Sequence, residues 1–236
     1  MQTITEIAKD ETLRVSGVYH YHLGGKDTHI REPWTIHEKS DGTRITRVER
    51  DASFFKANLL TEVVTSAGKI SRIDIRWQNG DEKLVSEATA TYIFDGNDLQ
   101  ISRVCDGQSY EEQHSLSDDV LISPLMRIGI GYVLTALVKY PEGTQVLIPN
   151  IKEPGNPDKL LSAYFERRQA KELSTEPVVA GGQMYQSKRY QYVGELYDED
   201  AQFWLDKHDI LLSYSWKQSD GMKWLVDLHD YERQYE

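Results

Sequence analysis

The chain contains 236 residues, of which 39% are hydrophobic and 28% are charged, a balance typical of a globular protein with a substantial core. Its formal net charge of −11 at pH 7 argues against nucleic acid as a partner, because binding a phosphate backbone needs a basic face. The single cysteine, Cys105, excludes an intramolecular disulfide framework.

The N-terminal sequence lacks the basic start, apolar core and small-residue cleavage site of a secretory signal. Together with the single cysteine, this predicts a cytoplasmic protein. The most apolar run, Leu125 to Val138, contains Arg127 and is shorter than the ~20 residues that a bilayer requires. We therefore predict no membrane-spanning segment.

Alternating apolar and polar residues predict a series of strands in the first half of the chain. The pattern is clearest where Ile73, Ile75 and Trp77 alternate with charged and polar residues, which predicts one dry and one wet face. Asn79-Gly80 then closes this strand with a strong hairpin signal. The predicted strands cover residues 13–23, 29–38, 43–50, 54–65, 72–78 and 109–116, with turns at 24–27, 40–42 and 66–68.

The connector between residues 118 and 143 has a different pattern, because its apolar residues recur at three- and four-residue intervals. This spacing predicts one amphipathic helix, although Gly129 and Gly131 each weaken it by about 1 kcal/mol. The apolar positions are Leu125, Ile128, Val133, Leu134, Leu137 and Val138. Pro141-Glu-Gly143 ends the helical pattern and marks the seam between two halves.

The second half again predicts strands, at residues 144–151, 164–173 and 184–197, with a turn at Gly181-Gly182. The last strand places Met222, Trp224, Val226 and Leu228 on one face. We expect it to pair with residues 210–216 across the turn at 219–221.

A sequence pattern in the first half recurs in the second. Residues 90–103 and 201–214 both read as a strand, a tight turn and a second strand, with Ala, Asp, Asp and Ser at equivalent positions. We interpret this as an internal duplication of two related curved sheets or β-rolls in a barrel-like, all-β and mainly antiparallel body. The predicted parts are a flexible N-terminus (1–11), a first β half (12–117), a partly helical connector (118–143) and a second β half (144–236), with a single compact domain as an alternative. A lipocalin-like barrel with a long C-terminal extension is the alternative fold.

Histidines on the first two predicted strands are the best metal candidates. His20 and His22 point to the same face, because residues i and i+2 of a strand do so. His29, His37 and Glu38 on the next strand are not spaced to complete a site. We therefore expect these histidines to line a half-polar strand face, and we predict no metal.

No catalytic motif stands out, and we predict no catalytic residues and no cofactor. Cys105 adjoins Asp106, whose charge would raise the pKa of the thiol, so an inert cysteine is expected. The adjacent acidic residues at 111–112, 118–119 and 198–200 point to opposite strand faces or into loops, which makes them poor acid–base partners. Gly129-Ile-Gly131 lacks the third glycine of a dinucleotide-binding turn.

Aromatic and apolar residues on curved strands remain as the candidate site. Such residues either fill a core or line a cavity for an apolar or sugar-bearing ligand, whose polar end a tyrosine hydroxyl or an arginine would orient. The candidate ligand-binding residues are Trp34, Trp77, Ile73, Ile75, Arg76, Tyr190, Tyr192, Tyr214, Trp216 and Leu134. In this interpretation the segment 125–138 would cover the opening as a lid, and the alternative is that it is ordinary core.

Three features of the sequence resemble known protein families: the repeated hairpin, the segment Phe203-Trp-Leu-Asp through Ile-Leu-Leu-Ser-Tyr214, and the terminal Trp224-Leu-Val-Asp-Leu228. With these motifs the chain resembles bacterial glycolipid-binding proteins built from two similar spiral β-rolls. In its last third it is also similar to open-barrel lipid carriers of the LolA and LolB type, in which a curved sheet holds acyl chains beneath a short helix. The resemblance implies an apolar ligand and supplies no catalytic residues.

We therefore expect a cytosolic binding protein for an apolar or amphiphilic small molecule, lipid-like or glycolipid-like. One alternative is an isomerase-type or hydratase-type enzyme that uses His20, His22 or a strand tyrosine as acid or base. Another is an oligomerising structural protein, a homo-oligomer joined through exposed strand edges.

Overall fold

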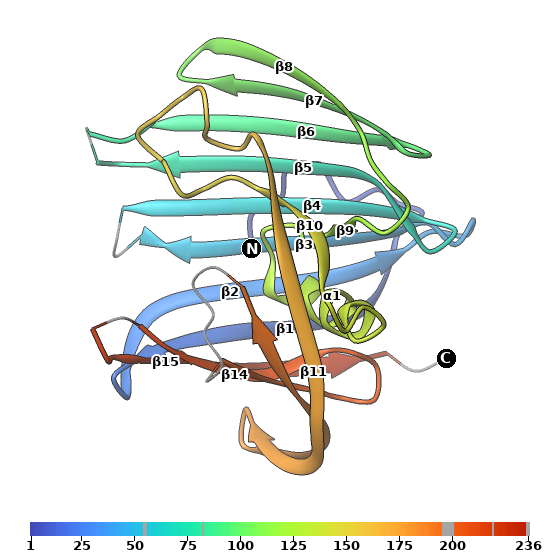
Figure 1. Ribbon diagram of the computed structural model, residues 1–236, viewed down its shortest axis with the longest axis vertical. Helices are drawn as coiled ribbons and strands as arrows, with labels where there is room; N and C mark the ends of the chain where they lie inside the picture. The colour runs from blue at the N-terminus through green and yellow to red at the C-terminus, as the bar shows by residue number, and fades with distance from the viewer. Residues whose placement is uncertain (54–55, 82, 195–200, 219, 235–236) are drawn as a thin grey trace.

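The computed structural model describes residues 1–53, 56–81, 83–194, 201–218 and 220–234 (Figure 1). The first half holds β1 (Thr12–Leu23), β2 (Lys26–Glu38), β3 (Arg44–Ala52), β4 (Ala57–Ser66), β5 (Lys69–Asn79), β6 (Glu87–Asp95), β7 (Asp98–Cys105) and β8 (Gln108–Ser115). The remainder holds β9 (Leu121–Ile122), the 3₁₀ helix η2 (Arg127–Gly129), α1 (Ile130–Leu137), β10 (Thr144–Pro149), β11 (Ala163–Ala180), β12 (Gln183–Val193), β13 (Gln202–Leu205), β14 (Leu211–Lys217) and β15 (Lys223–Arg233).

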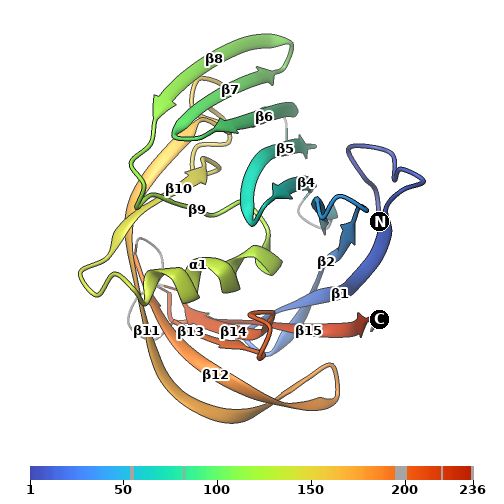
Figure 2. The same ribbon diagram turned by 90° about the vertical axis from the view of Figure 1, so that its right-hand side faces the viewer.

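The strands of the described ranges join one fifteen-stranded sheet, in the order β8-β7-β6-β5-β4-β3-β2-β1-β15-β14-β13-β12-β11-β10-β9. The chain starts in the middle of the sheet, meanders from β1 out to the edge at β8, crosses to the opposite edge at β9, and returns to β15 beside β1. Neighbouring strands are antiparallel except β9 and β10, which are parallel. The predicted all-β, mainly antiparallel fold with one helical segment is confirmed, and the sheet curls into a barrel-like body without closing (Figure 2).

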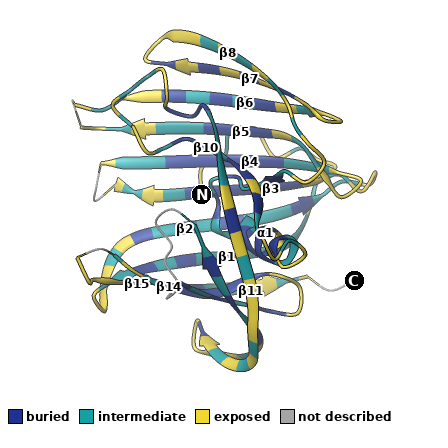
Figure 3. Ribbon diagram, viewed as in Figure 1, coloured by how far each residue is buried: buried dark blue, intermediate teal, exposed yellow. Residues whose placement is uncertain are grey.

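The connector between the two halves runs through the interior of this body. Figure 2 shows α1 within the curve of the sheet. Val133, Leu134 and Leu137 of α1 are completely buried. Burying one such side chain stabilises the folded state by about 1.5–3 kcal/mol, so the apolar face of α1 is part of the core. Buried positions gather in the middle of the strands and on α1, whereas the hairpin tips are exposed (Figure 3).

The helix is shorter than the predicted span of residues 125–138. Met126 has an extended backbone, with φ of −139° and ψ of 138°, and a 3₁₀ turn separates it from α1. Gly131 was expected only to weaken the helix, but it also has a packing role. A Cβ atom at this position would lie 1.8 Å from the carbonyl oxygen of Asp209, so only glycine lets α1 approach the β13–β14 turn.

A second segment, residues 150–162, covers the concave face of β6 and β7. The Tyr92 hydroxyl donates a hydrogen bond to the Leu161 carbonyl at 2.5 Å. The buried Arg103 guanidinium donates to the Leu160 carbonyl at 2.7 Å and to Glu112 at 2.8 Å. These bonds anchor the loop over the β6–β7 face.

The first eleven residues, for which we expected flexibility, lie against the outer face of β3 and β4. Arg47 on β3 is almost completely buried, and its guanidinium contacts Glu11 at 2.6 Å and Glu62 at 3.0 Å. The Thr5 hydroxyl donates to Glu62 at 2.6 Å. Removing one partner from such a buried ion cluster is strongly destabilising, so this network ties the N-terminal segment to the sheet.

The predicted strand pattern holds across most of the chain. Both copies of the repeated sequence form hairpins, one from β6 and β7 and the other from β13 and β14. The last strand pairs with β14 as expected. Residues 54–55 and 195–197 of two predicted strands, Ser219 of the last turn and the acidic run 198–200 lie outside the described residues. The duplication and the domain boundaries stay predictions.

Candidate functional site

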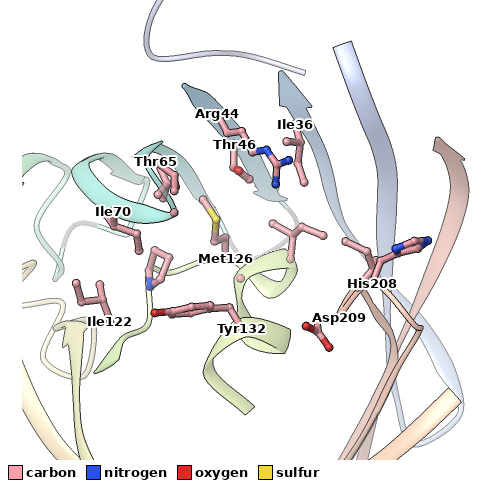
Figure 4. A pocket seen from close by; sticks show the side chains of 16 residues that line it. Ile36, Arg44, Thr46, Thr65, Ile70, Ile122, Met126, Tyr132, His208 and Asp209 are labelled. Carbon is pink, nitrogen blue, oxygen red and sulfur yellow. The ribbon is translucent and has the colours of Figure 1, made fainter. Parts of the chain in front are cut away.

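A pocket lined mainly by apolar side chains opens beside α1, and we call it the apolar pocket. Its volume is about 310 Å³. Figure 4 shows side chains from the strands, from the segment before α1 and from the β13–β14 turn around this space. The lining residues are Ile36, Arg44, Thr46, Val63, Thr65, Gly68, Ile70, Ile122, Pro124, Met126, Ile128, Gly129, Tyr132, His208, Asp209 and Ile210.

The strand wall of the apolar pocket follows from side-chain alternation. Ile36, Thr46, Val63 and Ile70 lie on four successive strands, β2 to β5, and face the same side of the sheet. The opposite wall comes from the connector, where the Tyr132 side chain projects from α1 and is 56% exposed. The Tyr132 ring is therefore accessible at the wall of the apolar pocket.

Charged side chains lie at one end of the apolar pocket. A neighbouring cavity of about 460 Å³ shares Ile36, Arg44, His208 and Ile210 with it, and adds Arg14, Glu38 and Arg233. The Arg44 guanidinium contacts Glu38 at 3.1 Å. The pocket therefore joins an apolar interior to a polar rim, an arrangement that suits a molecule with one apolar and one polar end.

Asp209 is the acidic side chain in the lining of the apolar pocket. Burial raises the pKa of its carboxyl, and the negative charge of Asp206 raises it further. Its backbone has a φ of 61°, which the tight turn between β13 and β14 requires. This environment therefore disfavours the charged form of Asp209 relative to water.

The connector is held in place by a buried carboxylate. Glu32 on β2 is completely buried, and it accepts hydrogen bonds from the backbone N–H of Arg127 at 2.7 Å and from the Arg50 guanidinium at 2.7 Å. The Tyr21 hydroxyl also donates to Glu32, and the Arg50 guanidinium reaches the Leu125 carbonyl at 3.4 Å. This cluster, the Glu32 hub, fixes the chain that forms one wall of the apolar pocket. The sequence alone does not predict the Glu32 hub, because a single Glu on a strand is expected to face solvent.

The ten residues proposed from the sequence do not line the apolar pocket in the described part of the chain. Most fill the core, because the concave face is already covered by the connector and by residues 150–162. The fully or nearly fully buried ones are Trp34, Ile73, Ile75, Tyr190, Tyr192, Tyr214 and Leu134, and the half-buried ones are Trp77, Arg76 and Trp216.

The contacts of these residues are mostly those of core side chains. Trp34 stacks on Tyr19 with 6.0 Å between ring centroids, and Tyr214 stacks on Phe203 at 4.9 Å. The Trp77 indole donates to a backbone carbonyl at 3.3 Å. Leu134 is fully buried, which favours the core alternative for the segment 125–138 over the lid.

Two pocket residues could have been found from the sequence. Ile36 lies two residues after Trp34, so the alternation that turns Trp34 inward also turns Ile36 inward. Tyr132 lies off the apolar stripe of the predicted helix, which signals an aromatic side chain outside the core. Thr46 gives no such signal, because a strand threonine is common on either face.

His20 and His22 lie on the outer face, away from the apolar pocket. His22 contacts Asp227 at 3.2 Å, His229 contacts the same carboxylate at 2.6 Å, and the His20 ring stacks on His229 at 3.9 Å. Burial and the neighbouring His229 lower the pKa of His20. No group of three or more potential ligands in the described ranges is arranged to hold a metal ion.

Cys105 is buried on β7. Burial raises the pKa of its thiol, which agrees with the expected inert character. Within the described ranges no helix is both long enough and apolar enough to cross a membrane.

The fold defines the class of this protein as an open, barrel-like antiparallel sheet with an internal helix. It is similar to the crystal structure of a β-barrel-like protein of the domain of unknown function DUF1849 from Brucella abortus, with a TM-score of 0.57, 9% identity, and coverage of 94% of this chain and 98% of that one. A DUF1329 family protein from Desulfovibrio piger ATCC 29098 matches with a TM-score of 0.26 and 11% identity over 95% of this chain and 86% of that one, too low to carry an argument. No protein family matches the sequence, and no curated protein does. The glycolipid-binding and lipid-carrier resemblances stay predictions.

Proposed function

We propose that this protein binds an apolar or amphiphilic small molecule, of the lipid or glycolipid class, in the apolar pocket. The proposal rests on one observation: the apolar pocket shares lining residues with the neighbouring cavity, whose walls carry charged side chains. The apolar part of the ligand would contact Ile70, Met126 and Tyr132, and its polar end would lie near Arg44.

The size of the pocket supports a ligand of modest length. A volume of about 310 Å³ lies near the lower end of the range for small-molecule sites, and the rim cavity extends the space. Each 100 Å² of apolar ligand surface removed from water would contribute about 2.5 kcal/mol. Two or three such patches would contribute about 5–7.5 kcal/mol before the cost of association is subtracted, so contacts at the charged rim are also needed for binding.

The test uses a fluorescent fatty-acid analogue and the variant Tyr132→Ala. Tyr132 is exposed by more than half, so the variant should keep its fold while it loses one wall of the pocket. The matched control is Val138→Ala, which shortens an exposed side chain just beyond α1 that does not line the pocket. We expect tighter binding to the wild type and the control than to Tyr132→Ala. Equal affinity in all three proteins would contradict the proposed site.

The enzymatic and oligomeric alternatives remain predictions. An oligomer would use the sheet edge at β8, which is rich in polar and charged residues of the kind that discourage edge-to-edge pairing. Native mass spectrometry separates the alternatives, because a bound lipid, a bound metal and a bare oligomer differ in mass.

A further inference from the structure

Two arginines stand where the apolar pocket meets the neighbouring cavity of about 460 Å³, the rim cavity. Arg44 at the start of β3 lines both spaces, and Arg233 at the end of β15 lines the rim cavity. We propose that the ligand of the apolar pocket is an anionic amphiphile, whose carboxylate or phosphate group binds between Arg44 and Arg233. Because a ligand in the apolar pocket is itself a proposal, the assignment of its polar group rests on the proposed function.

The register of the sheet connects Arg233 to the apolar wall. Arg233 pairs with Val15 of β1, and Val15 pairs with Ile36 of β2. Ile36 pairs with Thr46 of β3, and Thr46 pairs with Val63 of β4. Paired residues on neighbouring strands point to the same face of a sheet, so one row runs from Arg233 into the apolar pocket. An amphiphile that lies along this row would meet a guanidinium at one end and apolar side chains at the other.

The Arg44 guanidinium keeps donors for a ligand although it has a carboxylate partner. Its Nε donates to Glu38 at 3.1 Å, and 64% of the Arg44 side chain is exposed. Among the described residues, its two terminal nitrogens have no hydrogen-bond acceptor. A guanidinium has five N–H donors in a rigid fork, so the terminal edge can bind a second anion while Nε keeps Glu38.

Arg233 has a neutral partner. Its guanidinium donates a hydrogen bond to the Tyr231 hydroxyl, and burial raises the pKa of that hydroxyl to about 12, which keeps it uncharged at pH 7. Tyr231 donates in turn to Asp206 at 3.2 Å, and the other oxygen of Asp206 accepts from two backbone N–H groups of its own turn. In the described part of the chain no carboxylate forms an ion pair with Arg233. Its charge is therefore available to an anion in the rim cavity.

The acidic groups of the two cavities leave the Arg44 end of the site positive. Glu38 is the one carboxylate among the described residues that line the rim cavity, and both Arg44 and Arg14 contact it, at 3.1 Å and 3.9 Å. Asp209 lines the apolar pocket on the side of Tyr132, away from Arg44 (Figure 4). The charged end of an anionic ligand would therefore bind at Arg44 and not at Tyr132.

A purely structural role for the two arginines makes a different prediction. If Arg44 served only to hold Glu38, and Arg233 only to hold Tyr231, the affinity for an alkyl chain would not depend on the charge of its head group. Charge-assisted hydrogen bonds are about twice as strong as neutral ones, so an anionic head group is the discriminating probe.

The experiment is isothermal titration calorimetry at pH 8 in a phosphate-free buffer of low ionic strength. The probes share one eight-carbon chain: octanoate, octyl phosphate, 1-octanol and octyltrimethylammonium. We expect one of the two anions to bind at least tenfold more tightly than 1-octanol, and the cation to bind most weakly. Tighter octanoate binding identifies a carboxylate ligand, and tighter octyl phosphate binding identifies a phosphate ligand.

Two outcomes separate this assignment from the proposed function. If 1-octanol binds as tightly as both anions, the apolar pocket stands and the anionic ligand is overturned. If none of the four probes binds up to about 5 mM, the proposed function fails as well. Tyr132→Ala should weaken the binding of 1-octanol and of the tighter anion alike, because it removes a wall that the alkyl chain contacts.

Four further variants assign the charge to its residues. Arg44→Gln and Arg233→Gln should each lower the affinity for the tighter anion about tenfold and leave 1-octanol binding unchanged. The control is Arg72→Gln, since Arg72 is 50% exposed, pairs with Asp74 at 2.7 Å and lines neither cavity. Glu38→Gln should raise anion affinity about twofold to fivefold, because it removes a competing carboxylate. Unchanged anion affinity in either Arg44→Gln or Arg233→Gln would overturn the proposed binding between these arginines.

Discussion

The substitution Leu134→Ala tests whether the connector is core or lid. Leu134 is completely buried on α1 at the centre of the curved sheet. Leucine-to-alanine substitutions at buried sites cost about 2–5 kcal/mol, and the cost rises with the volume of the cavity that stays open. Because the Glu32 hub and the contact at Gly131 restrain the connector from collapsing, we expect a loss in the upper half of that range.

Urea unfolding followed by tryptophan fluorescence measures this loss. With an m value of about 3 kcal/mol per molar, a loss of about 3.5–5 kcal/mol moves the midpoint down by roughly 1.2–1.7 M. Val138→Ala, at an exposed position next to α1, serves as the control and should move it far less. A loss under about 1 kcal/mol for Leu134→Ala, together with weaker binding of an apolar probe, would refute the core assignment and restore the lid.

Three further predictions concern packing, buried charge and pH. Gly131→Ala should destabilise the protein by about 1–3 kcal/mol or more, because the added Cβ would overlap a backbone carbonyl. Gly129→Ala is the control, since a Cβ there meets only ordinary contacts. Thermal unfolding of the two variants measures the difference. Glu32→Gln should cost about 3–5 kcal/mol in urea unfolding, since Arg50 would keep its charge without its carboxylate, and a change under about 1 kcal/mol would contradict the Glu32 hub. Burial raises the pKa of Tyr21 to about 12, whereas an unfolded tyrosine titrates near 10, so its contribution to stability is complete below pH ~10 and is lost as the pH rises through 12. Unfolding free energies that stay constant from pH 9.5 to about 12 would argue against this burial.

The strands could be predicted from the sequence because alternation and turn residues are local signals. Ile73 and Ile75 face inward as their spacing predicts, and Asn79-Gly80 ends β5. The wet face of the same strand was predicted less well, since Asp74 is buried where it accepts hydrogen bonds from Arg72 at 2.7 Å and from Thr91 at 2.8 Å. A charged residue at a polar position gives no sign of a partner on the next strand.

The arrangement of the strands could not be predicted, because it depends on contacts far apart in the chain. The pairing of β1 with β15, which places Tyr21 opposite Val226, leaves no mark in either strand alone. The path of the connector through the barrel is likewise set by Glu32 and Arg127, which are distant in sequence. For this reason the sequence identified aromatic core residues as the candidate site, whereas the apolar pocket is formed where the connector meets the strand ends.

The most direct test of the central claim is native mass spectrometry of delipidated protein incubated with a total lipid extract. The apolar pocket can be filled by Ile70→Trp, whose matched control is Lys69→Trp at the neighbouring exposed position of β5. We predict that the wild type and Lys69→Trp each take up one lipid-like molecule per chain and that Ile70→Trp, folded by its melting curve, takes up none. Equal uptake by Ile70→Trp, or no uptake by the wild type, would contradict the assignment of this pocket as a site for apolar or amphiphilic ligands.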